Sequence, residues 1–90
     1  PDEIGRLKEI VLSGTGVPRP GGRIERVEDF RERYLQEVVG DIKLSRPLKV
    51  VCATGNGTAG AFAPEALRRM GAEVIEMDAD LDWSFPKYNP

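Results

Sequence analysis

A glycine-rich segment near the middle of the chain has residue types that could bind a phosphate. Gly55–Gly60, with the sequence G-N-G-T-A-G, matches the pattern G-x-G-x-x-G of dinucleotide-binding loops. Glycine permits positive φ and close approach of the backbone, and a following helix presents free N–H groups to a phosphate. Asp78 stands about where an acid could bind a ribose hydroxyl. The alternative is that these glycines only form a tight turn between a strand and a helix.

Two features weigh against a nucleotide site at this loop. Pro64 is expected to interrupt the following helix one turn in. The chain has 90 residues, which is too short to supply the second mononucleotide-binding half of a dinucleotide fold. Arg68 and Arg69 could contact a phosphate, but neighbouring residues on a helix face different directions, so we expect them to be surface charges.

Asp78, Asp80 and Asp82 alternate along the chain, as the first ligands of a calcium-binding loop do. Such a loop needs glycine at its sixth position and a bidentate glutamate at its twelfth, where this sequence has Trp83 and Asn89. We therefore predict a solvated acidic turn, and we assign no metal site to it.

Cys52 is the only cysteine, and it stands in a short apolar run where cysteine usually packs as a small hydrophobic residue. The chain contains no histidine, which excludes Ser–His and Cys–His pairs and any histidine-based metal site. We therefore assign no catalytic residue, no cofactor-binding residue and no metal ligand to this chain.

The composition indicates one small globular domain, with 40% hydrophobic and 31% charged residues. A net charge of -2, with no basic stripe, predicts neither a nucleic-acid partner nor a membrane partner. The single cysteine suits a reducing compartment, so we expect a cytoplasmic location. The chain runs from Pro1 to Pro90 without an initiator methionine, and we expect it to be part of a longer polypeptide.

The hydrophobic pattern predicts the elements that hold these segments. Apolar residues at helical spacing predict three helices, over Asp2–Leu12, from Phe30 to Ile42, and over Phe62–Met70. Alternating or β-branched runs predict three strands, an edge strand at Arg23–Val27, a buried strand at Leu48–Ala53 and a strand at Glu73–Met77. Gly14–Gly22, rich in glycine and proline, is expected to be a loop.

The short strand–helix–strand link predicts a right-handed parallel crossover. The expected fold is therefore α/β, a three-layer-type unit with a short, mostly parallel sheet flanked by helices. Because no helix follows the last strand, we expect a truncated domain.

The order of motifs resembles the second domain of the bacterial α-D-phosphohexomutases, the phosphomannomutase/phosphoglucomutase family. The resemblance covers nearly the whole chain, and the segments that carry it are Leu48–Val51, Gly55–Gly60, Ala63–Leu67, Met70–Val74 and Leu81–Pro90. The last of these is similar to the family's D-G-x-F-P-x-x-x-P segment. Upstream, Gly22–Val27 followed by Tyr34 is similar to the family's approach to this domain.

The resemblance implies a four-domain enzyme that interconverts hexose 1-phosphate and hexose 6-phosphate through a phosphoserine, with Mg²⁺ held by a D-G-D-x-D-R loop. Neither that loop nor a T-A-S-H-N-P serine loop occurs in these residues. The resemblance therefore transfers no site residue, and we expect the chain alone to be inactive. It implies that residues 1–22 are a helix and linker from the preceding region, and that residues 23–90 are the N-terminal part of domain II.

Two other functions stay open from the sequence. One is a small dinucleotide- or nucleotide-binding module that uses Gly55–Gly60. The other is an interaction domain that docks through the aromatic tail, Trp83–Pro90. We otherwise expect this tail to pack within the parent protein, either over the sheet edge or onto one of the other domains of the same polypeptide.

Overall fold

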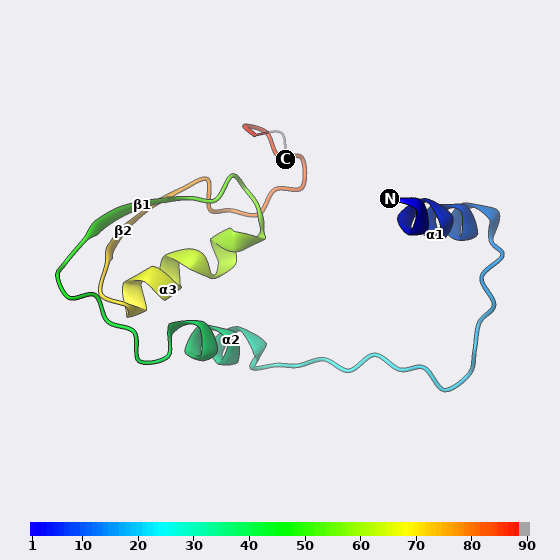
Figure 1. Cartoon of the computed structure of the whole chain (residues 1–90), viewed down its shortest axis with the longest axis horizontal. Helices are drawn as coiled ribbons and strands as arrows, with labels where there is room; N and C mark the ends of the chain where they lie inside the picture. The colour runs from blue at the N-terminus through cyan, green and yellow to red at the C-terminus, as the bar shows by residue number, and fades with distance from the viewer. Residues whose placement is uncertain (89–90) are drawn as a thin grey trace.

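A computed structural model describes residues 1–88 and has principal extents of 56 × 34 × 22 Å. Figure 1 shows helix α1 at one end, joined by a long extended segment to the remaining elements. In chain order the elements are α1 (Asp2–Ser13), α2 (Phe30–Val39), β1 (Lys49–Ala53), the 3₁₀ helix η1 (Thr58–Ala61), α3 (Ala63–Arg69) and β2 (Glu73–Met77). Within residues 1–88 no helix is both long and apolar enough to cross a membrane.

The sheet has two parallel strands, β1 and β2, with Val50 opposite Val74 and Cys52 opposite Glu76. The chain passes from β1 to β2 through η1 and α3, so the predicted strand–helix–strand unit and the α/β class are confirmed. Both strands lie where the sequence placed them, β1 beginning one residue later than expected.

Helix α3 covers one face of this sheet. Arg68 of α3 forms an ion pair with Glu76, which shares a face with Val74 and Val50 because side chains alternate along a strand. On the opposite face Val51 is 58% exposed. The prediction that the β1 strand is buried was therefore wrong: residues along it alternate between half-buried and exposed. The prediction rested on the continuous apolar sequence of β1, a pattern typical of strands in a sheet that is covered on both faces.

The core lies between α2 and α3. Leu35 is fully buried and forms a cluster with Val39 and Ala66, against which Phe62 and Met70 pack. The apolar stripe of α2 was correctly predicted, but the helix ends earlier than the stripe suggests. Its C-cap is Gly40, which has a φ of 50° and donates its N–H to Gln36 at 2.8 Å, leaving Ile42 outside the helix and exposed.

Two further expectations were wrong. Arg23–Val27 is not a strand: Ile24 is fully exposed, and the described residues place no strand beside it. Alternating residues bury one face only when a neighbouring strand and a core exist to receive them.

Pro64 does not interrupt a helix either, because it lies in the first turn of α3, where an N–H would have no helical partner.

Helices α2 and α3 are also joined by charge. The guanidinium of Arg69 donates two hydrogen bonds to Glu32, at 2.9 and 2.7 Å, and one to Glu65 at 3.2 Å. These bonds lower the pKa of Glu32 and raise the pKa of Arg69. The Lys43 ammonium donates to the Arg69 carbonyl at 2.6 Å and so fixes the chain that leaves α2 against the end of α3.

Gly60 marks the closest approach between η1 and the segment after β2. A Cβ atom at this position would lie 2.8 Å from the carbonyl carbon of Ala79 and closer still to its oxygen. Since this neighbour is backbone, it cannot rotate away as a side chain could.

We expect Gly60→Ala to destabilise the fold by about 1–3 kcal/mol, the range typical of an overpacked site. The matched control is Gly22→Ala, because a Cβ at Gly22 would meet no atom within 4 Å. Urea unfolding followed by circular dichroism measures both variants. Equal midpoints for the two would show that η1 does not need the close contact with Ala79.

We expect Glu32→Gln to lower the melting temperature near neutral pH. Because the folded-state pKa of Glu32 is lowered, its stabilisation is present above the unfolded-state pKa and is lost as the pH falls through the folded value. The difference between the variant and the parent chain should therefore vanish in acid. Glu37→Gln is the control, since Glu37 forms no ion pair among residues 1–88. A pH-independent difference would contradict the role of the charge.

Candidate functional site

The glycine loop begins with a tight turn directly after β1. Gly55 and Asn56 have positive φ, 58° and 61°, and Gly57 donates its N–H to the Thr54 carbonyl at 3.0 Å. Two positive φ values at the central residues are typical of a type I′ turn, which Gly and Asn adopt most readily. The turn reverses the backbone and leads it into η1, which begins at Thr58.

This turn is hydrogen-bonded to the segment that follows β2. The Asn56 backbone N–H donates to the Asp78 carbonyl at 2.7 Å, and the Asn56 side-chain amide donates to the Asp80 carbonyl at 3.0 Å. The Asn56 carbonyl accepts from the N–H of Asp82, also at 3.0 Å. Thr54 adds a bond from its hydroxyl to the Asp78 carbonyl at 3.0 Å. The glycine turn and the acidic segment therefore form a single unit.

The tail folds back over this unit. Lys87 forms an ion pair with Asp78, whose side chain is only 8% exposed, and the pair raises the pKa of Lys87. The ring of Tyr88 lies against Gly55, where a Cβ would be 3.2 Å from the ring. Trp83, by contrast, is 75% exposed. We expected the tail to pack within the parent protein, and Lys87 and Tyr88 do contact the glycine unit, whereas Trp83 does not pack in this chain. Asn89 and Pro90 lie outside the described residues.

The groups that a dinucleotide would need are engaged by the chain itself. Tyr88 covers Gly55, the Ala79 backbone fills the space beside Gly60, and Lys87 neutralises Asp78. Helix α3 has only seven residues, which gives a short macrodipole. The geometry favours the structural interpretation of the glycines, and nothing in it favours a nucleotide site.

The three aspartates that resembled a calcium loop do not converge. Asp78 pairs with Lys87, while Asp82 accepts hydrogen bonds from the N–H and hydroxyl of Ser84 at 2.9 and 2.7 Å. Those bonds lower the pKa of Asp82. Among residues 1–88 no three histidine, cysteine or acidic side chains are grouped so as to hold a metal ion. The described residues thus do not fit Mg²⁺, and Asn89, the twelfth loop position, lies outside them.

Arg68 and Arg69 point to different partners, as their adjacency on a helix predicts. Arg68 pairs with Glu76 across the sheet face, whereas Arg69 pairs with Glu32 and Glu65 on the side of α2. Cys52, predicted to be a core residue, is half-buried in β1. The structure brings none of these side chains together with the glycine turn in one site.

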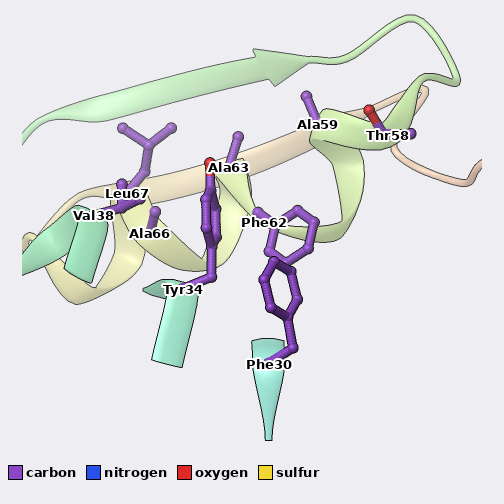
Figure 2. Close-up of a pocket in the computed structure, with 9 residues that line it drawn as sticks. All are labelled: Phe30, Tyr34, Val38, Thr58, Ala59, Phe62, Ala63, Ala66 and Leu67. Atoms are coloured by element: carbon purple, nitrogen blue, oxygen red, sulfur yellow. The ribbon is translucent and has the colours of Figure 1, made fainter. Parts of the chain in front are cut away.

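An apolar groove of about 630 Å³ lies between α2 and the η1–α3 segment, and sequence reasoning missed it. Figure 2 shows the rings of Phe30, Tyr34 and Phe62 gathered at it. The Tyr34 and Phe62 rings meet edge to face with centroids 4.8 Å apart. Among residues 1–88 no charged side chain lines the groove, and its side-chain polar groups are the hydroxyls of Tyr34 and Thr58, so it is suited to burying apolar surface. Its sequence signal was the aromatic part of the α2 stripe, which indicated only a buried helix face.

Comparison with known proteins agrees with this geometry. Residues 32–90 match the family model described as phosphoglucomutase/phosphomannomutase, alpha/beta/alpha domain II. A phosphomannomutase/phosphoglucomutase of Pseudomonas putida is 45% identical over 69 residues, which are 77% of this chain and 15% of that protein. Its counterpart in Pseudomonas syringae pv. tomato is 42% identical over 89 residues, which are 99% of this chain and 19% of that protein.

The fold leads to the same family. The crystal structure of a phosphoglucomutase/phosphomannomutase family protein from Burkholderia thailandensis superposes with a TM-score of 0.72 at 34% identity. The match covers 99% of this chain and 19% of that protein. The chain thus spans less than a fifth of the length of these relatives. By motif order, sequence identity and fold alike, the chain belongs to the phosphoglucomutase/phosphomannomutase family, and its residues 32–90 match the family's domain II.

Proposed function

We propose that the chain is the N-terminal part of domain II of a hexose-phosphate mutase and that its share in catalysis is structural. The parent enzyme would interconvert hexose 1-phosphate and hexose 6-phosphate through a phosphoserine, in the cytoplasm. The observation that carries this proposal is the match of residues 32–90 to domain II, within a chain that spans 15–19% of the relatives.

The chemistry of the described residues supports the structural role. Phosphoryl transfer needs an anchored nucleophile, cationic groups or a metal that converge on the phosphate, and exclusion of water. Here Lys87, Arg68 and Arg69 are all paired with carboxylates of the same chain. The nucleophile, the Mg²⁺ ligands and the sugar-binding groups would therefore come from other segments of the parent polypeptide, and residues 1–90 would supply none of them.

We further propose that the domain begins at residue 23. Helix α1 has no buried residue, and an extended segment separates it from the core in Figure 1. Residues 1–22 would then be a helix and linker belonging to the preceding region. The exposed apolar side chains of α1, such as Leu7 and Val11, and those of the open sheet face, such as Val51 and Ile75, would contact other parts of the same polypeptide.

A chimeric enzyme tests the proposal. The segment of the Pseudomonas syringae pv. tomato phosphomannomutase/phosphoglucomutase that aligns with 89 residues of this chain is replaced by the chain's aligned residues. We expect the chimera to retain turnover of hexose 1-phosphate in a coupled assay, because the exchanged segment positions the domain without touching substrate. The purified chain alone should show no turnover.

The chimera carrying Gly60→Ala is the matched variant, and the chimera carrying Gly22→Ala is its control. We expect the first to lose thermal stability while the KM of the folded fraction stays unchanged. A chimera that folds but has no activity, or turnover by the chain alone, would overturn the structural assignment.

A further inference from the structure

We propose that Asn56 is a site of spontaneous deamidation, whose rate is set by the contacts that hold the glycine turn closed. The sequence provides the reactive pair, because Asn56 is followed by Gly57, which has no side chain to hinder attack on the asparagine. Asparagine is among the thermally labile residues of proteins. This inference concerns chemical modification of the chain and is independent of the proposed mutase role.

The reaction requires only water. The backbone nitrogen of Gly57 loses its proton and attacks the side-chain carbonyl carbon of Asn56. A carbon–nitrogen bond forms, the side-chain nitrogen leaves as ammonia, and a five-membered succinimide results. Water then adds to one of the two ring carbonyl carbons, the bond between that carbon and the ring nitrogen breaks, and the nitrogen takes a proton from the water. The product is aspartate or isoaspartate at this position. No oxidant or reductant takes part.

The closed turn opposes both parts of the first step. The Gly57 N–H that must lose its proton donates to the Thr54 carbonyl at 3.0 Å. The Asn56 amide that must be attacked donates a hydrogen bond to the Asp80 carbonyl, also 3.0 Å long, which restricts its rotation. Both bonds must break before the ring can close, so the reaction proceeds through a locally opened turn.

The side chain of Asn56 is held at one end only. Its Oδ1 atom is buried and has no hydrogen-bond partner among the described residues. A buried acceptor without a partner costs free energy, which lowers the cost of releasing this amide. Conversion to a carboxylate would also remove the donor to the Asp80 carbonyl and bring a negative charge to that carbonyl oxygen, which would repel it. The modified turn could not close again in the same way.

The tail decides how often the turn opens. Lys87 is paired with Asp78, to whose carbonyl the Asn56 N–H is bound, and Tyr88 covers Gly55. Loss of these two tail contacts would release Asp78 and Gly55, which both adjoin Asn56. Loosening the tail is therefore expected to raise the rate of deamidation without unfolding the core around Leu35.

The test follows aspartate and isoaspartate at position 56 by peptide mapping and mass spectrometry after incubation at mildly alkaline pH. Asn89 serves as the internal reference, because the next residue, Pro90, has no N–H to attack it. We expect the full chain to react at least about tenfold more slowly in buffer than in denaturant, since opening of a folded segment is disfavoured.

Two lysine variants separate local opening from global unfolding. Lys87→Ala should raise the rate in buffer about 1.5- to 5-fold, the range expected for the loss of an ion pair whose lysine lies at the surface. Lys49→Ala removes a lysine that is equally exposed, from a 3.4 Å pair with the exposed Glu73 at the opposite end of the sheet, and should leave the rate unchanged. Circular dichroism verifies that both variants are folded.

Gly57→Ala tests the chemistry itself and does not depend on folding. An added methyl group hinders attack by the residue 57 nitrogen, so the reaction in denaturant should slow markedly. Equal rates in buffer and denaturant, equal acceleration by the two lysine variants, or an unchanged rate in Gly57→Ala would each overturn the proposal.

Discussion

Asn56 binds the strand-to-helix turn to the segment beyond β2 through a donated N–H, an accepted N–H and a side-chain amide. These bonds fix where β1 ends relative to β2 and direct the chain into η1, from which α3 begins its path across the sheet. Gly60 permits the same approach a few residues later. The parallel strand pair therefore depends on a corner made mostly of backbone, in which side-chain size is limited by contact with the neighbouring backbone.

Apolar burial is concentrated elsewhere, between the helices. Full burial of a leucine contributes roughly 1.5–3 kcal/mol, whereas an exposed ion pair contributes about 0–1 kcal/mol. Leu35 thus outweighs the bonds between Arg69 and Glu32, which orient α2 more than they stabilise it. With this small cluster beneath one face, the other face of the sheet shows Val51 to solvent. In the aromatic groove, Phe30 and Tyr34 are likewise partly exposed.

The sequence predicted the elements whose signals are local. The β2 strand, the stripe of α2 and the glycine corner each follow from residue type and spacing within a few positions. The expectation of a strand at Arg23–Val27 was wrong, because a strand requires a neighbouring strand and the described residues place none beside it. The contact of Tyr88 with Gly55 was equally hidden, since it joins positions far apart in sequence. Long-range packing decided both outcomes, and the hydrophobic pattern does not encode it.

The indole of Trp83 lies on the tail and faces solvent, while the buried cluster contains aliphatic side chains. It is the chain's only tryptophan. Its fluorescence emission consequently reports the surroundings of the tail and is insensitive to the packing around Leu35. An optical melting curve recorded at the indole band and one recorded from the helical signal would describe two different events in the same molecule.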